Sequence, residues 1–342
     1  VTVLGCYSAL LVTLFDFPGR RILAWALLLP MAMPAYVVAY AYTDFFQPSS
    51  PLMSGLQAAL DLPRGALPDV RSLGGAVLVF TLTLYPYVYL LVRAALLARA
   101  ARLLEAAHLL GAGLTRRILT IALPMARPAI AAGVALVLME TLADFGVSSY
   151  FGIQTYTAGI YKAWLVLDDA NAASQLASLL LVFVLVLLVV EQRAQQRMRF
   201  ASSRPNASTN ATQPQRLSGL PGLGWIMLGT LPVLLGFVLP TVILIDLWLG
   251  SEQQVAWQRF ADWCLNSLRL GGITAVLAVG LSLALLASKR LSASRWLNSL
   301  TQLVSLGYAI PGAVVVVGIL MPLRWFQDTP VVSDMSYWVT AT

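Results

Sequence analysis

The sequence predicts an all-α membrane protein, a polytopic bundle of transmembrane helices. Two observations lead to this fold class. First, 59% of the 342 residues are apolar and only 11% are charged, whereas soluble domains carry about 25% charged residues. Second, the apolar residues gather into long runs, and a helix needs about 20 of them to cross a bilayer. Such a chain cannot cover itself with polar surface, so its outer face must meet lipid. The composition therefore excludes a cytosolic enzyme.

Eight apolar runs are predicted to be membrane spans. The first is short because the chain opens at Val1 inside an apolar run, with no initiator Met or signal-cleavage site before it. We therefore expect the natural N-terminus to lie further upstream. The predicted spans are 1–17, 22–44, 72–92, 128–145, 173–191, 222–248, 265–287 and 298–320.

The basic residues predict the orientation of these spans. When successive loops are assigned alternately to the two sides, 16 of the 22 Lys and Arg fall on one side and 6 on the other. Cytoplasmic loops are enriched in Lys and Arg, so the richer side is predicted to be cytoplasmic. The net charge of +7 is then explained by topology, and we predict no nucleic-acid partner.

The chain repeats itself weakly. Residues 2–11 resemble residues 274–283, and each copy is followed by a short basic loop. Met33–Val38 then resembles Ile310–Val315, each with a proline that we place inside a span. Both copies run in the same direction, so the repeat is parallel. A stretch rich in Arg, Ser, Asn, Thr and Pro between them is typical of a flexible linker. We predict a first half over 1–192, a cytoplasmic linker over 193–221 and the start of a second half over 222–342.

The loop between the third and fourth predicted spans holds the most specific motif. Its fixed residues are, in order, Glu105, Ala106, Ala107, Gly111, Ile121, Leu123 and Pro124. This resembles the EAA loop of ABC-importer permeases, whose pattern EAA-x3-G-x9-I-x-L-P agrees at every fixed position. Good helix formers before Gly111 predict a short helix that ends at this glycine. Pro124 suits the first turn of the next helix.

The resemblance implies the type I ABC importer permease fold in two tandem halves. In that family the loop's helix sits in a groove on an ATPase subunit. It implies two ATPase subunits, a periplasmic substrate-binding protein and membrane lipid as partners. It also implies the inner membrane of a bacterium as location, with the EAA loop in the cytoplasm.

No catalytic residue and no cofactor are assigned to this chain. A phosphate-binding loop of the form G-x4-G-K-[ST] is missing, because neither Lys162 nor Lys289 follows a glycine. The chain is therefore not expected to be an enzyme, and ATP and Mg²⁺ would be used by the partner subunit. The two cysteines form no CxxC pair and there is one histidine, so no metal site is assigned.

Residues 140–164 resemble the matching stretch of ferric-iron (Fe³⁺) importer permeases, which carry two fused halves, each with an EAA loop. Glu105 follows Pro34 by 71 positions, and the same distance after Pro311 falls near position 382, beyond Thr342. We therefore expect the second half to be truncated before its own EAA loop. The resemblance implies ferric iron as the substrate, passed from the binding protein to the cytoplasm.

Four polar residues are candidates for the translocation path. Glu140 and Asp144 would lie near the outer end of the fourth span, where carboxylates usually face a cavity or a partner. Oxygen ligands also suit a hard ferric ion. The competing interpretation is a pair of helix-packing carboxylates. Tyr150 and Gln154 could line the outer mouth, although tyrosine is also a common interfacial anchor.

Three alternatives stay open at this point. The EAA loop does not separate iron from thiamine, phosphonate, sulfate or polyamine as the substrate. Parallel repeats and intramembrane carboxylates also fit a secondary transporter driven by an ion gradient. A membrane scaffold without a transport role would have the same composition.

Overall fold

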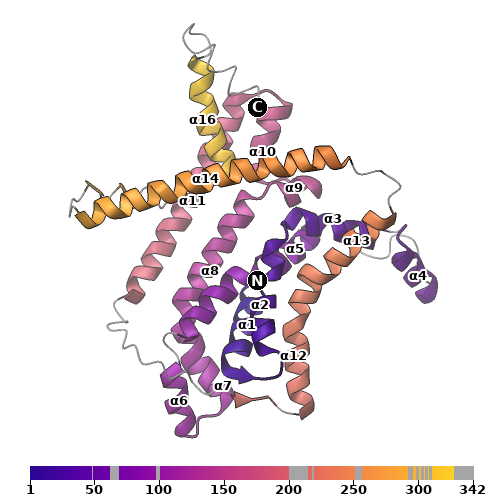
Figure 1. The fold of residues 1–342 in the computed structure, drawn as a ribbon, viewed down its shortest axis with the longest axis vertical. Coiled ribbons are helices and arrows are strands. Elements are labelled where there is room, and N and C mark those ends of the chain that lie inside the picture. Colours follow the sequence, from indigo (N-terminus) through magenta and orange to yellow (C-terminus); the bar gives the residue numbers. More distant parts are fainter. Residues whose placement is uncertain are drawn as a thin grey trace. The chain divides into compact units, whose positions relative to one another are not determined.

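The computed structural model is built almost wholly from helices (Figure 1), which confirms the all-α fold class. It describes residues 1–47, 49–61, 69–97, 101–199, 215–217, 219–250, 256–291, 296–297, 300–301, 304, 307 and 310–326. The chain forms two compact units, one made of Val1–Ile245 with the segment that begins at Pro311, and the other of Asp246–Ile310. The predicted halves are stretches of sequence and do not coincide with these units, so the division into halves stays a prediction.

The elements of the first unit follow one another in a simple order. Residues 118–122, 162–166 and 234–238 are π-helical, and 29–32 form a 3₁₀ helix. The elements are α1 (Thr2–Leu14), β1 (Phe15–Asp16), α2 (Arg20–Ala26), η1 (Leu29–Ala32), α3 (Ala35–Phe46), α4 (Pro51–Leu60), α5 (Leu73–Ala95), α6 (Ala101–Leu109), α7 (Leu114–Arg117), η3 (Ile118–Ala122), α8 (Leu123–Ala143), α9 (Gly146–Tyr150), α10 (Tyr156–Tyr161), η4 (Lys162–Val166), α11 (Ala170–Arg199), β2 (Gln215–Arg216), α12 (Gly219–Val233), η5 (Leu234–Val238) and α16 (Gly312–Phe326).

Most of the predicted membrane spans are confirmed. Among the described residues, five helices are long and apolar enough to cross a bilayer: Leu73–Ala95, Leu114–Ala143, Ala170–Val189, Gly222–Gly250 and Trp257–Leu291. The predicted spans 1–17 and 298–320 correspond to the shorter apolar helices Thr2–Leu14 and Gly312–Pro322. Part of the 298–320 prediction and residues 200–214 of the predicted linker lie outside the described residues.

The predicted span 22–44 is not one helix, and placing Pro34 inside a helix was wrong. The chain bends by 87° between Arg20–Ala32 and Ala35–Phe46. Proline excludes the residue before it from helical geometry, and Met33 is accordingly extended, with φ −99° and ψ 123°. Pro34 therefore caps α3 and accepts hydrogen bonds from the backbone of Val37 and Val38.

Pro311 occupies the same position in the second copy of the repeat. Its carbonyl accepts from Val314 and Val315, at 2.9 and 3.3 Å, as that of Pro34 accepts from Val37 and Val38, at 3.0 and 3.3 Å. It too precedes a helix, α16, and does not lie within one. The resemblance between the two segments therefore extends from the sequence to the backbone hydrogen bonds.

The core of the first unit is formed where α5 passes between α1 and α8 (Figure 1). A glycine meets α5 from each side, because a Cβ on Gly5 of α1 would lie 2.7 Å from Val88 Cβ and one on Gly133 of α8 would lie 2.8 Å from Val88 Cα. Small residues let membrane helices approach closely and gain dispersion contacts. The tight three-helix contact around Val88 thus depends on these two glycines.

Two tyrosines of α5 donate hydrogen bonds to backbone carbonyls near the end of α2, before the chain bends. The hydroxyl of Tyr89 donates to the Ala24 carbonyl at 2.8 Å and that of Tyr85 donates to the Leu27 carbonyl at 2.9 Å. A helix that stops inside a bilayer leaves carbonyls without backbone partners, and each must find another donor. The buried tyrosines therefore make the 87° break tolerable.

A two-residue parallel ladder between β1 and β2 was also not predicted from the sequence. Phe15 pairs with Gln215 and Asp16 with Arg216, and the Leu217 N–H donates to the Asp16 carbonyl at 2.9 Å. Phe17 and Leu217 also contribute to one apolar cluster with Leu104. The first loop, the end of the linker and the EAA loop therefore meet at one end of the unit, which agrees with their prediction on the same side of the membrane.

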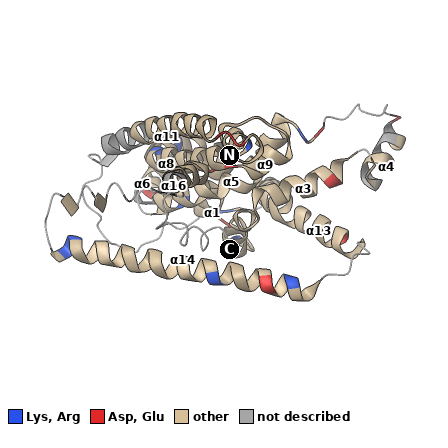
Figure 2. Ribbon diagram, turned by 90° about the horizontal axis from the view of Figure 1, so that it is seen from above, with Lys and Arg blue, Asp and Glu red and all other residues tan. Residues whose placement is uncertain are grey.

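The second unit contains the longest helix, α14 (Trp257–Leu291), and α13 (Leu239–Gly250) leads into it. Charged residues of α14 occur in its first part, up to Arg269, and at its end, and none occurs between Arg269 and Lys289 (Figure 2). This uncharged stretch is long enough to span a bilayer, which fits the prediction of a span over 265–287.

Candidate functional site

The EAA loop forms a short helix, a turn and the start of a long helix. Glu105 and Ala106 lie in α6 with exposed side chains, whereas Ala107 is half-buried. The predicted helix is therefore present, and its first two motif residues are exposed, whereas its role in docking stays a prediction. Because Ala106 and Ala107 are small, a partner surface can approach this face of the helix closely.

The motif glycine ends this helix. Gly111 has φ +78°, a left-handed conformation that side chains with a Cβ disfavour. Its N–H bonds to the His108 carbonyl at 2.9 Å, and the Ala112 N–H bonds to the Ala107 carbonyl at 2.9 Å. This pair of bonds is a Schellman motif. The spacing between the second alanine and the glycine is thus the spacing that this helix end requires.

The last three motif residues fall at a change of helix type. Ile121 lies in the π-helix η3, and the Leu123 N–H bonds to the Ile118 carbonyl, five residues back. Leu123 and Pro124 are the first two residues of α8. A proline within an α-helix clashes with the carbonyl four residues before it. The wider π turn ends immediately before Pro124, so the proline stands where α-helical geometry begins.

The long helix that carries this junction starts earlier than predicted. The predicted fourth span covers 128–145, whereas the apolar helix runs continuously over Leu114–Ala143. The second part of the EAA loop, from Leu114 onwards, is therefore continuous with a membrane-spanning helix.

Two exposed leucines lie at the end of α6. Leu109, its last residue, is 82% exposed, and Leu110, which follows it, is 87% exposed. Exposed leucines next to a carboxylate and small residues are typical of a surface that another protein covers. The sequence alone had singled out the fixed motif positions and missed these leucines.

The two candidate carboxylates of the translocation path both have protein partners. Glu140 Oε1 accepts from the Tyr87 hydroxyl at 3.1 Å. The Asp144 carboxylate accepts from Ser148 N–H at 3.0 Å, from Ser148 Oγ at 3.2 Å and from Val147 N–H at 3.4 Å. These contacts agree with the interpretation as helix-packing carboxylates. A role in the path stays a prediction for both.

The other two candidates, Tyr150 and Gln154, have different surroundings. The Tyr150 ring lies beside the Tyr40 ring, with centroids 6.1 Å apart and the ring planes tilted by 55°, and the Arg71 guanidinium carbon lies 5.1 Å from the Tyr150 centroid. Arg71 also donates to the Tyr150 hydroxyl at 3.4 Å. Gln154 lines a pocket of about 720 Å³ to which Tyr150 does not contribute.

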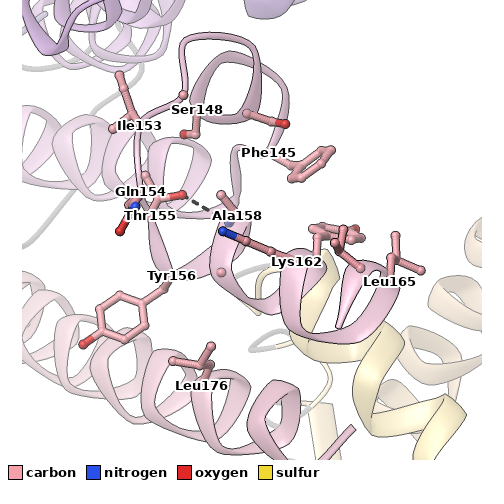
Figure 3. Close-up of a pocket in the computed structure, with 15 residues that line it drawn as sticks. Phe145, Ser148, Ile153, Gln154, Thr155, Tyr156, Ala158, Lys162, Leu165 and Leu176 are labelled. Carbon is pink, nitrogen blue, oxygen red and sulfur yellow. Dashed lines mark hydrogen bonds between the residues drawn. The ribbon is translucent and has the colours of Figure 1, made fainter. Parts of the chain in front are cut away.

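This pocket is lined by α9, α10, η4 and Leu176 of α11 (Figure 3). Its wall is largely apolar and aromatic, with Phe145, Tyr156 and Tyr161 among the lining residues. Lys162 is the one charged residue among them, and no sequence pattern had singled it out as a pocket residue. A pocket with a lone ammonium group and no carboxylate favours an anionic or neutral ligand over a bare cation.

A resident metal centre finds no support in the described part of the chain. Among those residues, no three His, Cys, Asp or Glu side chains are grouped so that they could hold a metal ion.

A bundle of helices long and apolar enough to cross a bilayer, with an exposed helix that carries the EAA motif, defines the class of this protein as a membrane permease component. The chain belongs to the family of binding-protein-dependent transport system inner membrane components, which it matches over residues 2–200. The predicted membership in the EAA-loop permease family is thereby confirmed.

Curated relatives of this chain differ in the substrate that they are named for. It is 27% identical over 332 residues to the thiamine transport system permease protein ThiP of Brucella abortus. It is 24% identical over 331 residues to the Fe(3+)-transport system permease protein FbpB 2 of Haemophilus influenzae. Both matches cover 93% of this chain and 59% of the relative, so the chain spans about three fifths of their length. A putative 2-aminoethylphosphonate transport system permease protein, PhnU of Salmonella paratyphi A, is 29% identical over 201 residues, which cover 57% of this chain and 68% of the relative.

Proposed function

We propose that this chain is the transmembrane permease subunit of an ATP-driven importer in a bacterial inner membrane. The observation that carries the proposal is the EAA loop, whose fixed residues form an exposed helix, a Schellman end and a π-to-α junction continuous with α8. An exposed helix joined by a short turn to a membrane-spanning helix suits a docking element that receives force from another subunit. The loop faces the cytoplasm in this proposal.

The partners follow from this role. Two ATPase subunits engage the EAA helices, and a periplasmic binding protein delivers the substrate on the opposite side. Closure of the ATPases around ATP favours the outward-facing state of the permease, and hydrolysis returns the inward-facing state, because each state is stabilised by different contacts. ATP and Mg²⁺ are bound by the ATPase subunits, and the permease itself binds no cofactor.

We propose ferric iron as the substrate, supported by the resemblance of residues 140–164 to ferric-iron permeases and by the relative from Haemophilus influenzae. A second candidate is an organic phosphonate. Lys162 in the pocket favours it, because an ammonium group attracts the negative phosphonate oxygens. Thiamine is the third substrate for which relatives are named.

Reconstitution tests both parts of the proposal, the role as an ATP-driven importer and the identity of the substrate. The full chain is incorporated into proteoliposomes with candidate ATPase and periplasmic binding proteins from the same genome. Uptake of radiolabelled Fe³⁺, thiamine and 2-aminoethylphosphonate is then measured with and without ATP. ATP-dependent uptake of one substrate supports the importer, and accumulation of Fe³⁺ alone supports the iron assignment. Uptake driven by an ion gradient without ATPase subunits would contradict the importer.

A further inference from the structure

We propose that Leu104 is the positioning residue that couples the docking helix to the membrane core. This inference rests on the proposed function, because it assigns a route by which force from an ATPase subunit reaches the transmembrane helices. Leu104 directly precedes the EAA motif and is not one of its fixed residues.

Leu104 differs from its neighbours in burial. It is 4% exposed, whereas Leu103, the preceding residue, is 52% exposed and Glu105 is also exposed. Among the described side chains of α6, Leu104 is the one that is buried. The helix therefore points one leucine fully inward, while its other described side chains are half-buried or exposed.

Leu104 belongs to the apolar core that the membrane helices share. The same cluster contains Val92 and Leu96 from the end of α5, Ala122 of η3, Ala126 of α8 and residues of α1. The α6 helix also packs against η3, the π-helical segment that contains Ala122. Ala122 and Ala126 are fully or almost fully buried and small, so space beside them accommodates a leucine.

Close-packed interiors transmit displacement because they contain little free volume. A push on α6 is therefore passed to η3, against which α6 packs, and from η3 to the rest of the apolar cluster. If Leu104 is shortened, α6 keeps its Schellman end and its exposed docking surface but loses its apolar contact with the core. Binding of the ATPase and transmission of its movement should then separate.

The experiment compares Leu104→Ala with Leu103→Ala, which removes the same atoms from the adjacent exposed position. Each full chain is purified and reconstituted with the ATPase and binding proteins. Two quantities are measured: the amount of ATPase subunit that co-purifies, and the number of substrate molecules imported per ATP hydrolysed. For Leu104→Ala we expect co-purification within about twofold of wild type and a fall of about fivefold or more in imported substrate per ATP, the lower end of typical coupling between sites. Leu103→Ala should leave this ratio at the wild-type value.

Two further variants keep the test decisive. Leu104→Met conserves volume and should restore coupling. If Leu104→Ala is not recovered in the membrane, Leu104→Val is measured by the same criteria. Equal ratios of import to hydrolysis in the Leu104 and Leu103 variants would overturn the role of Leu104. Failure of the wild-type chain to co-purify with any ATPase subunit would instead overturn the proposed function, so the two failures are distinguishable.

Discussion

The hydroxyl of Tyr87 donates a 3.1 Å hydrogen bond to Oε1 of Glu140 and so joins α5 to α8. The carboxylate that the sequence singled out as a path residue is thus engaged by a neighbouring helix. The effects of this pair on stability and on transport can be measured separately. A change at Tyr87 removes the hydrogen bond, and a change at Glu140 can remove the charge while an acceptor remains.

We predict that Tyr87→Phe lowers the free energy of unfolding by about 1 kcal/mol, the usual size of a hydrogen bond between membrane helices. Glu140→Gln keeps an acceptor for Tyr87 and should cost less. If the charge of Glu140 contributes to the path, Glu140→Gln reduces uptake at unchanged thermal stability in detergent. Wild-type uptake by this variant would exclude a role for the charge.

Gly111→Ala is expected to disrupt the end of the docking helix. A Cβ at this position meets no atom within 4 Å, so the cost comes only from the φ of +78° and amounts to about 1–2 kcal/mol. The variant should bind less ATPase subunit in co-purification.

Gly113→Ala is the matched control for Gly111→Ala. This glycine is also free of contacts within 4 Å, but its φ is −61°, which alanine adopts without strain. Equal binding of the ATPase by both variants would show that the left-handed turn does not matter for docking.

Asp144→Ala should destabilise the α8–α9 connection by about 1 kcal/mol, the typical loss when a carboxylate no longer accepts from a helix N-terminus. Asp144→Asn keeps an oxygen acceptor for the Ser148 and Val147 N–H groups and should retain most of the stability. Thermal unfolding of the two variants checks this order. Uptake is the second readout, because loss of uptake in a stable Asp144→Asn variant would indicate that the charge acts on the substrate.

Gly133→Ala is predicted to loosen the packing of α5 against α8. The added methyl group would lie 2.8 Å from Val88 Cα, a backbone atom that cannot turn aside, and such overpacking typically costs about 1–3 kcal/mol. Gly224→Ala in α12, where a Cβ meets nothing within 4 Å, is the control. A Tm of Gly133→Ala equal to or above that of Gly224→Ala would contradict the tight contact.

The spans and the docking loop were predictable because both depend on local sequence. Apolar runs of sufficient length identify membrane helices. The EAA motif spans about twenty residues, and its glycine and proline lie at the end of one helix and the start of another. The break at Pro34 was missed because apolar composition is the same on both sides of it. The restriction that proline places on Met33 was the available signal, and the tyrosines that satisfy the freed carbonyls lie far away in α5.

The remaining features depend on contacts between distant segments, which one sequence does not reveal. Leu104 is one of many leucines, and only packing distinguishes it from Leu103. Lys162 became a candidate only when α9, α10 and α11 were seen to surround it. Asp144 shows the reverse case, since a carboxylate at the end of a span fits a substrate path or a helix cap equally well until its partners are known.

The ladder between Phe15–Asp16 and Gln215–Arg216 has a consequence for biosynthesis. These residues are separated by about 200 positions, and the nearby Tyr7 hydroxyl bonds to the Trp225 carbonyl at 2.7 Å. During translation α1 emerges long before these partners exist, so its contacts must be completed by a much later part of the chain. A chain whose synthesis stops before position 215 would therefore contain a bundle in which α1 still lacks these neighbours, a substrate for membrane quality control.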